Sequence, residues 1–396
     1  MCSTKPTIRL SAAIRFCPRS SIRLWKASRR YWRPWQSGNP RRRRPSLRTL
    51  SICALPKSWT TAALSTGFID DEELMSTLVF GGAGFVGSHV VRKLMDEGED
   101  VVALDISMPD PPMPPLRDVM GKLKFEYCHG EYAAEVDSAV ARQKPDRIIN
   151  LVTSYLPEFE NNPPRGVDIN LHTQLNILEA ARHFGVRRVV QSSSGHYYGP
   201  DRGEWVNEDS LANPDTLYGA CKAMNEYLGM HYHERFGVDF VALRFSLVLG
   251  WGRGQRKFIS DRGPWIVDIF EKPLAGLPVR IPYAAKEGSV VYIKDLVTII
   301  MTVLMAPKLP HRVYDVVTEP RSKARAAEIV RKLIPGAQIE LDMNGAFGQE
   351  WPVEKPPRRA WEKMRLTEDF GYRHKYSFEA AIADYIQMAK ANKFSW

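Results

Sequence analysis

The sequence predicts an α/β fold in which helices cover both faces of a doubly wound parallel sheet. Its 396 residues are 44% hydrophobic and 25% charged, which is the composition of a globular chain. From Met75 onward, short apolar segments alternate with longer amphipathic segments. Parallel strands need long crossover connections, usually helices, so this alternation favours parallel pairing.

The apolar segments are short and rich in Val, Leu and Ile, as in strands that are buried on both faces. They predict strands at 77–82, 100–107, 123–130, 146–154, 187–195 and 238–250. The amphipathic segments predict helices at 87–98, 133–145, 170–185, 292–304, 325–334 and 378–391. Gly98 and Pro145 belong to the residue types that commonly end helices.

The first 74 residues differ in chemistry from the rest. Positions 1–69 hold fifteen of the 55 Lys and Arg residues and none of the 45 acidic ones, so the formal charge of +10 becomes −5 beyond them. The chain after residue 69 is therefore mildly acidic, and a negative net charge does not favour binding to nucleic acid. We expect residues 1–74 to be disordered. Three interpretations of this segment stay open: an organelle presequence, a basic arm that binds a partner, or an extension upstream of a natural start at Met75.

The cysteine pattern and the apolar runs narrow the class of protein further. The five cysteines are irregularly spaced and no CxxC pair occurs, so neither a disulfide framework nor a zinc site is expected. No metal site is predicted. No apolar run reaches the roughly 18 residues of a membrane span. We expect a cytoplasmic protein, with organelle import through the Arg-rich N-terminus as the alternative.

A glycine-rich corner joins the first predicted strand to the first helix, in the stretch TLVFGGAGFVGSHVV (77–91). Gly81 permits a tight turn, Gly84 leaves the backbone open to a pyrophosphate, and Gly87 lets the helix pack closely on the strand. The free N–H groups of the helix N-terminus favour a phosphate at this place. Asp105, 24 residues after Gly81, follows the second strand and suits the ribose hydroxyls of NAD better than the phosphate of NADP.

Tyr218 and Lys222 lie four residues apart in YGACK, so one helix face carries both. A tyrosine that acts as a base near neutral pH needs its pKa lowered by roughly 3 units, and a neighbouring ammonium acts in that direction. The serines of QSSSG end a predicted parallel strand, where open α/β sheets build their sites. A serine hydroxyl there can hold the substrate oxygen while the tyrosine moves the proton.

These segments resemble the extended short-chain dehydrogenase/reductases, also called NAD-dependent epimerase/dehydratases. The resemblance covers the chain from about Met75 to its end. It is carried by GGAGFVG (81–87), Asp105, DINLHTQLNILEAAR (168–182), SSSGHYYG (192–199), YGACK (218–222), ALRFSLVLG (242–250), VYIKDLV (291–297) and the closing GYRHKYSFEAAIADYI.

The resemblance implies a Rossmann core over 75–250, and a smaller cap over 251–396 that binds substrate and returns some segments to the core. It implies that Ser194 polarises the substrate, Tyr218 is the acid/base and Lys222 holds the nicotinamide ribose. Beside Tyr218 and Lys222, the implied NAD-binding residues are Gly81, Gly84, Phe85, Val86, Gly87, Asp105, Glu131, Tyr132, Leu151, Val152, Thr153, Asn170, Ser192 and Phe245. The implied substrate residues are Tyr155, His196, Tyr197 and Leu247, with His196 and Tyr197 facing either the substrate or the core. A homodimer is also implied.

Three departures from the family pattern reduce the number of reactions and substrates that the sequence favours. Leu247 stands where nucleotide-sugar members carry an Asn that touches the diphosphate, and GSV (288–290) stands where they carry RDF. Burying a diphosphate without hydrogen-bond donors to its oxygens costs free energy. Other cationic side chains could supply those donors, namely Arg253, Arg256, Lys257 and Arg280. Ser194-Gly195-His196 replaces the Thr-Asp-Glu of the sugar dehydratases, so dehydration is not expected.

The sequence therefore predicts an NAD-dependent oxidoreductase that acts on a secondary alcohol of a sugar-like or hydroxy-acid substrate. The first alternative is a sugar or nucleotide-sugar epimerase that works through a transient keto intermediate, since the same three side chains serve both reactions. The second alternative, from another class, is a non-catalytic NAD-sensing or RNA-associated protein.

Overall fold

The computed structural model describes residues 75–396 apart from 156–158, 160, 201–202, 204, 256–264 and 346–357. The segment 1–74, with its three interpretations, lies outside the described residues. Arg256 and Lys257 lie outside them as well. Within the described part of the chain, no helix is long and apolar enough to cross a membrane.

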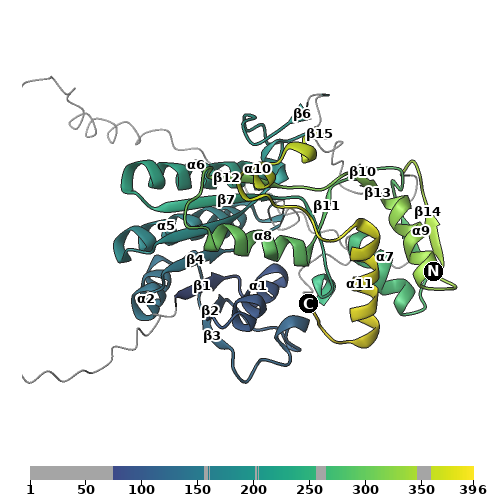
Figure 1. Cartoon of the computed structure of the whole chain (residues 1–396), viewed down its shortest axis with the longest axis horizontal. Coiled ribbons are helices and arrows are strands. Elements are labelled where there is room, and N and C mark those ends of the chain that lie inside the picture. The colour runs from purple at the N-terminus through teal and green to yellow at the C-terminus, as the bar shows by residue number, and fades with distance from the viewer. Residues whose placement is uncertain are drawn as a thin grey trace, which may run out of the picture. The chain divides into compact units, whose positions relative to one another are not determined.

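Seven parallel strands form the central sheet, in the order β12-β7-β5-β4-β1-β2-β3 (Figure 1). Their bounds are β1 (Ser76–Phe80), β2 (Asp100–Asp105), β3 (Lys124–Tyr127), β4 (Arg147–Asn150), β5 (Arg188–Ser194), β7 (Asp239–Phe245) and β12 (Val313–Val316). The strand order reverses at β1, with β2 on one side and β4 on the other. Ligands of open α/β sheets bind beyond the carboxyl ends of the strands at such a switch point.

Helices cover both faces of the sheet, which confirms the predicted doubly wound α/β fold (Figure 1). Val79 of β1 belongs to a core cluster on the side of α1 (Phe85–Asp96) and α8 (Ile293–Met305). Its neighbours Leu78 and Phe80 belong to the cluster on the other face. The helices of that second face are α2 (Ala133–Gln143), α5 (Thr173–Phe184) and α6 (Leu217–Phe236).

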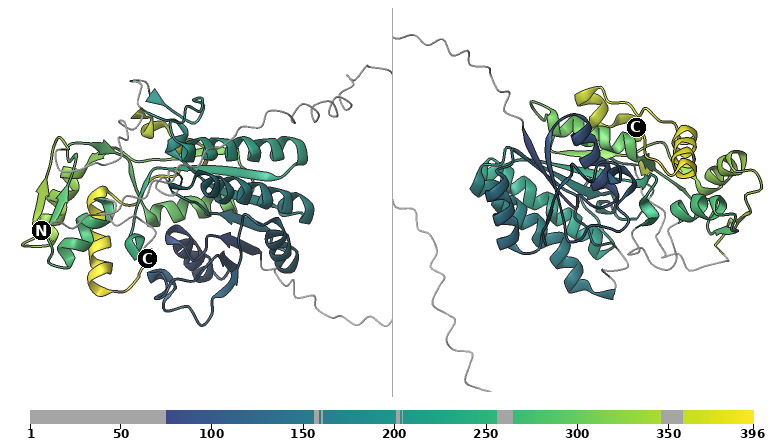
Figure 2. Two further views of the ribbon diagram at one scale, coloured as in Figure 1. Left: turned by 180° about the vertical axis from the view of Figure 1, so that it is seen from behind. Right: turned by 90° about the horizontal axis from the view of Figure 1, so that it is seen from below.

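The C-terminal part adds helices and four two-stranded sheets (Figure 2). The strand pairs are β6 (Trp205–Val206) with β15 (Arg358–Arg359), β8 (Leu247–Leu249) with β11 (Val290–Tyr292), β9 (Val279–Ile281) with β14 (Ile339–Leu341), and β10 (Glu287–Gly288) with β13 (Arg321–Ser322). The helices are α7 (Trp265–Leu274), α9 (Lys323–Leu333), α10 (Arg365–Phe370) and α11 (Phe378–Ala391). The division into a core and a substrate-binding cap stays a prediction.

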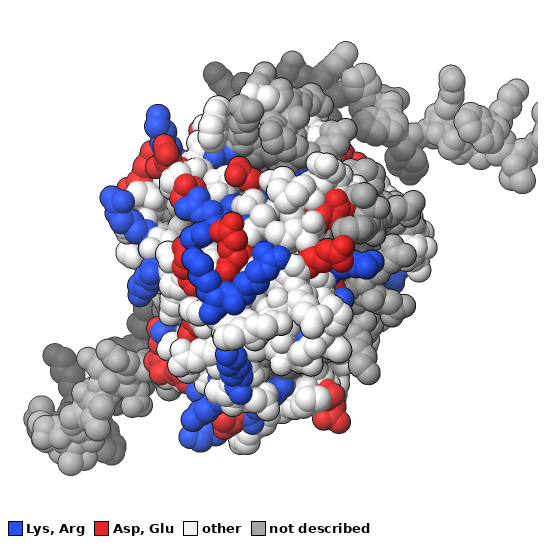
Figure 3. All heavy atoms as spheres, turned by 90° about the vertical axis from the view of Figure 1, so that its right-hand side faces the viewer, with Lys and Arg blue, Asp and Glu red and all other residues white. Residues whose placement is uncertain are grey.

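Short helical turns complete the described fold. Their bounds are η1 (Pro114–Leu116), α4 (Pro163–Val167), the π-helical turn η2 (Asp168–His172), η3 (Gly195–Tyr197), η4 (Arg253–Gln255) and η5 (Trp361–Lys363). On the face drawn in Figure 3, acidic and basic side chains lie next to one another rather than in separate single-sign fields. That mixed face does not present the basic stripe typical of nucleic-acid binding.

The single strand predicted at 238–250 is wrong, because the structure divides it at Ser246. The N–H of Ser246 donates to the carbonyl of Val316 at 3.1 Å, at the point where the chain leaves the central sheet. β7 stays in that sheet, whereas β8 pairs with β11. Both pieces are apolar, and a continuous apolar run does not show where one strand changes partner.

Candidate active site

The turn between β1 and α1 is shaped by close backbone contacts. Gly81 has a φ of 76°, in the left-handed region that favours glycine. A Cβ on Gly87 would overlap the carbonyl oxygen of Gly81, so α1 can start this close to the turn only without a side chain there. A Cβ on Gly82 would lie 2.8 Å from the Cβ of Ala103 in β2. The sequence analysis assigned no role to Gly82, although it adjoins the predicted triplet.

The start of α1 carries no side-chain cap. Gly84 precedes the helix in an extended conformation, and no side chain bonds to the N–H groups of the first turn. Phe85 and Val86 are the first helical residues. Unpaired N–H groups and the positive end of a helix dipole bind phosphate well. The turn therefore fits the pyrophosphate of a dinucleotide.

Asp105 lies beside this turn. It is the last residue of β2, is buried, and accepts a hydrogen bond from the N–H of Ile106 at 2.9 Å. The N–H groups of Gly81 and Gly82 donate to the carbonyl of Leu104 at 2.8 Å and 3.0 Å. These bonds hold the turn against the end of β2. The contact of the Asp105 carboxylate with the ribose of NAD stays a prediction.

The predicted serine and tyrosine lie together at the carboxyl end of β5. Ser194 is the last residue of β5, and Tyr218 is the second residue of α6. The hydroxyls of Ser194 and of Thr153, which follows β4, lie near enough to the Tyr218 phenol to lower its pKa. Tyr155 stacks on the Tyr218 ring with centroids 6.1 Å apart, and His196 meets it edge-on at 5.5 Å. Two of the predicted substrate residues therefore flank the tyrosine.

Lys222 lies one helical turn after Tyr218 and faces the same place. Its Nζ donates to the carbonyl of Ser192 at 2.9 Å and lies 5.7 Å from the centroid of the Tyr218 ring. Only 2% of Lys222 is exposed, and this burial lowers its pKa to about 8. The ammonium remains mostly protonated at neutral pH, so a positive charge stands beside the phenol.

The surroundings of Tyr218 act on its pKa in both directions. Burial raises the pKa of Tyr218 above its ordinary value of 10. The hydrogen bonds of Ser194 and Thr153 and the charge of Arg253 act in the opposite direction without outweighing burial. The protein alone therefore holds a protonated phenol, and the lowering that a base needs must come from what binds beside it.

Asn170 fixes the loop that carries Thr153. Its Oδ1 accepts from the Thr153 hydroxyl at 3.0 Å, and its amide donates to the carbonyls of Ser154 and Gly166 at 3.2 Å and 2.9 Å. Asn225 of α6 donates to the carbonyl of Asn170 at 2.8 Å. Asn225 was not predicted, because nothing in its local sequence shows that it bridges two helices.

The other predicted cofactor residues lie along the same edge of the sheet. The N–H of Leu151 donates to the carbonyl of Phe80 at 2.9 Å, and that of Val152 donates to Asn150 Oδ1 at 3.1 Å. Phe245, the last residue of β7, is paired in register with Ser194. Leu151 and Val152 thus follow β4, which lies beside β1, whereas Phe245 ends β7 further along the sheet.

Glu131 and Tyr132 follow β3 at the outer end of the sheet. The Glu131 carboxylate forms an ion pair with Arg165 at 2.7 Å. Tyr132 is 53% exposed and its ring lies 5.5 Å from that of His129. Neither residue is brought to the Ser194–Tyr218 pair, and their predicted contact with the adenine half of NAD stays a prediction.

Tyr197 faces the core, which corrects its assignment as a substrate residue. Its ring packs under the guanidinium of Arg244, whose Cζ lies 3.6 Å from the ring centroid. It lines an open pocket of about 340 Å³ that Ser194 and Tyr218 do not line. His196 and Tyr197 are adjacent in a 3₁₀ turn, so they point in different directions, and only His196 reaches Tyr218.

The fold and this arrangement of side chains define a nucleotide-binding α/β protein with a Ser–Tyr–Lys set. The profile of the NAD dependent epimerase/dehydratase family matches residues 77–316, which is more than half of the chain. The chain belongs to this family, whose cofactor is NAD. The uncapped helix start and the glycine-rich turn before it fit that cofactor.

Known proteins of several activities resemble the chain. UDP-glucose 4-epimerase of Lactobacillus helveticus is 32% identical over 177 residues, which are 44% of this chain and 52% of that protein. UDP-glucose 4-epimerase of Thermus thermophilus, solved with NAD, has a TM-score of 0.67 at 25% identity, over 80% of this chain and 99% of that chain. An L-threonine dehydrogenase from Clostridium difficile shares the fold, with a TM-score of 0.67 at 21% identity over 81% and 99%. The chain spans about half the length of curated relatives such as the first of these.

Proposed function

We propose that the protein is an NAD-dependent oxidoreductase acting on a secondary alcohol of a sugar-like or hydroxy-acid substrate. The observation that supports it is the Lys222 ammonium 5.7 Å from the Tyr218 ring, with Ser194 near enough to the phenol to lower its pKa. NAD, when bound, accepts the hydride. The protein must then hold the alcohol oxygen and take its proton.

In this proposal each of the three side chains has a separate task. The Ser194 hydroxyl donates to the substrate oxygen and orients it toward Tyr218. Tyr218 takes the hydroxyl proton in oxidation and returns it in reduction. Lys222 acts through its charge, which stabilises the tyrosinate, and through its bond to the Ser192 carbonyl, which positions it.

The surroundings of Leu247 favour a substrate without a diphosphate. Leu247 of β8 is paired in register with Val290 of β11. Of the two family positions that usually contact a diphosphate, Leu247 is apolar and Gly288, at the place of the Arg of RDF, has no side chain. Arg280, one possible substitute, forms an ion pair with Glu340 at 2.8 Å on the paired strands β9 and β14.

Epimerisation of a sugar or nucleotide sugar is the second candidate function. Relatives that are 32% to 34% identical to this chain are UDP-glucose 4-epimerases. An epimerase would use the same Tyr218 to oxidise and then reduce one carbon. It would return NAD to its starting state after each turnover, whereas a dehydrogenase releases NADH.

The experiment is to incubate the protein with NAD and a panel of hydroxy acids, polyols and UDP-sugars, and to follow NADH absorbance and sugar isomers in parallel. The proposal expects NADH formation with a hydroxy acid or polyol, and a loss of about 10²- to 10⁴-fold in kcat for Tyr218→Phe with NAD affinity retained. Isomerisation of a UDP-sugar without NADH would establish the epimerase instead. If NAD binds and Tyr218→Phe changes no measured property, the non-catalytic alternative is correct.

A further inference from the structure

The segment 392–396, which follows α11, lies along one face of α1, the helix that begins at the cofactor turn (Figure 1). The Phe394 ring is buried and meets the His89 ring edge-on, with centroids 5.3 Å apart. Trp396 extends the contact, because its Nε1 donates to Asp96 at 2.7 Å. The α1 residues that the segment touches recur at the spacing of one helix face. They are His89, Arg92, Lys93 and Asp96.

His89 is a fully buried side chain that takes no part in the proposed reaction. Its Nδ1 lies 2.8 Å from the carbonyl oxygen of Phe85, one helical turn earlier. A carbonyl only accepts hydrogen bonds, so Nδ1 carries the proton and is the donor. Burial lowers the pKa of His89 to about 4, which leaves the ring uncharged near neutral pH. Nε2 bonds to no residue in the described part of the chain, so the bond to Phe85 orients the ring.

The Phe85 carbonyl is anchored by two side chains at the start of α1. It accepts from the Ser88 hydroxyl at 3.0 Å as well as from His89. In a planar trans peptide this carbonyl and the N–H of Val86 point in opposite directions. Bonds to the carbonyl therefore hold the Val86 N–H toward the open end of the helix, where the first N–H groups have no partner within the helix. That end is the predicted place of the NAD pyrophosphate.

Aromatic contacts keep the His89 ring in the orientation that this bond needs. The ring meets Phe85 edge-on at 5.5 Å and Phe394 edge-on at 5.3 Å. Edge-to-face pairs of this kind stabilise one relative orientation of the two rings. Loss of the Phe394 ring would leave a cavity beside His89, and the imidazole could then turn away from the Phe85 carbonyl.

We propose that His89 is a positioning residue of the cofactor turn, and that the segment 392–396 strengthens NAD binding by holding His89 in place. The proposal rests on NAD as the cofactor of the family, and it applies to an oxidoreductase and to an epimerase alike. Its effect falls on the pyrophosphate, because the N–H groups at the start of a helix donate to phosphate oxygens. Since coupling between two sites is reciprocal, bound NAD should in turn hold the segment more firmly.

A purely structural role of the same contacts makes different predictions. If Phe394 and His89 only fill the core, their substitution lowers the melting temperature and weakens every ligand of the cofactor site to the same degree. A positioning role instead weakens ligands that carry a pyrophosphate and spares those that lack one.

The first test measures binding to the full-length protein by calorimetry, below the onset of thermal unfolding of each variant. NAD and ADP-ribose carry the pyrophosphate, whereas adenosine, measured by its competition with NAD, does not. His89→Leu should weaken NAD and ADP-ribose by about 10-fold and leave adenosine nearly unchanged. His89→Asn keeps an N–H donor near the place of Nδ1 and should recover most of the loss. Equal weakening of ADP-ribose and adenosine in His89→Leu would overturn the proposal.

The second test addresses the segment and does not depend on the folding of the His89 variants. Phe394→Ala should weaken NAD by about 3- to 10-fold. Phe370→Ala is the matched control, because it removes a ring that packs on Tyr314 at 5.6 Å in another part of the C-terminal region, and it should leave NAD affinity unchanged. NAD should also slow amide hydrogen exchange in 392–396 of the wild type. Unchanged NAD affinity in Phe394→Ala, or exchange that NAD does not slow, would overturn the role of the segment.

These outcomes are separate from those of the proposed function, because binding is measured without turnover. If no substrate yields NADH but the His89 and Phe394 variants lose NAD affinity as expected, the oxidoreductase proposal is refuted and this inference stands. If a hydroxy acid is turned over and both variants bind NAD like the wild type, the inference alone is overturned.

Discussion

Tyr218 shows at the residue scale how burial and hydrogen bonding oppose each other in one side chain. Only 7% of the residue is exposed, and loss of solvent raises the pKa of its phenol. Ser194 and Thr153 lower that pKa by hydrogen bonding. Since the phenolate is the active form in alcohol oxidation, each of these bonds affects the pH at which the enzyme becomes active.

We predict that Thr153→Val shifts the rise of kcat/KM for alcohol oxidation to higher pH. The substitution removes one bond that lowers the pKa of Tyr218, so the phenol deprotonates later. Thr153→Ser keeps a hydroxyl and should leave the profile close to that of the wild type. The pH dependence of NADH formation measures both variants, and a shift to lower pH in Thr153→Val would show that Thr153 does not lower the pKa of Tyr218.

At the scale of elements, the turn between β1 and α1 depends on glycines that allow two elements to touch. The N–H of Gly84 donates to the carbonyl of Gly81 at 3.0 Å, and Gly87 packs over the same residue. A strand followed by this glycine spacing and a helical pattern is a local signal, so the sequence predicted it. The close approach of Gly82 to β2 depends on a strand 21 residues further on and was not predicted.

Gly87→Ala is predicted to weaken NAD binding strongly and to lower stability by about 1–3 kcal/mol, because the new methyl group overlaps the carbonyl of Gly81. Gly121→Ala is the matched control, since nothing lies within 4 Å of its Cβ position. Titration of NAD followed by protein fluorescence, together with thermal unfolding, tests the pair. Equal NAD affinity in the two variants would refute the packing argument.

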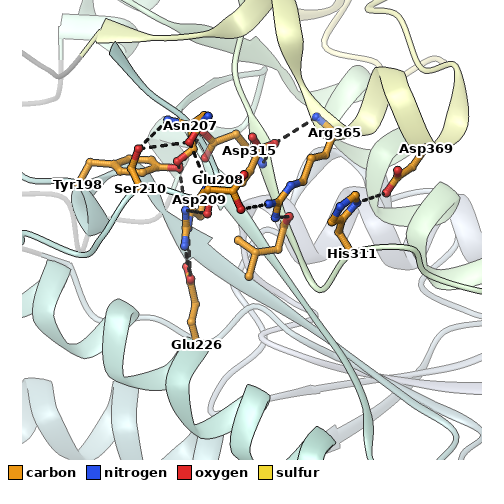
Figure 4. A network of polar contacts seen from close by, with 12 residues as sticks. Tyr198, Asn207, Glu208, Asp209, Ser210, Glu226, His311, Asp315, Arg365 and Asp369 are labelled. Atoms are coloured by element: carbon orange, nitrogen blue, oxygen red, sulfur yellow. Dashed lines mark hydrogen bonds and ion pairs between the residues drawn. The ribbon is translucent and has the colours of Figure 1, made fainter. Parts of the chain in front are cut away.

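At the scale of the whole folded part, a buried polar network joins the central sheet to the C-terminal segment (Figure 4). Arg244 of β7 forms an ion pair with Glu226 of α6 at 2.7 Å, and both side chains are at most 5% exposed. Glu208 accepts from the N–H groups of Asp315 in β12 and Arg365 at the start of α10, each at 3.2 Å. Segments more than 150 residues apart are held together in this way.

Arg244→Met is expected to lower the free energy of unfolding by about 3–5 kcal/mol, because Glu226 would remain as a buried charge without its cation. The double variant Arg244→Met/Glu226→Gln removes that charge and should recover part of the loss. Chemical denaturation measures all three proteins. A double variant that is as unstable as Arg244→Met, or less stable, would show that the two side chains do not act as a pair.

The sequence by itself predicted six of the seven strands of the central sheet, the glycine turn and the pairing of Tyr218 with Lys222 on one helix face, because each rests on a pattern within one strand, one turn or one helix. The homodimer, the cap and the roles of the site residues stay predictions. Tertiary structure decided which way neighbouring side chains face: Tyr197 turns to Arg244, while His196 meets Tyr218. It also brought Arg359 to Gly195 across more than 160 residues of chain. Packing between distant segments sets such contacts, and no local pattern of residues records them.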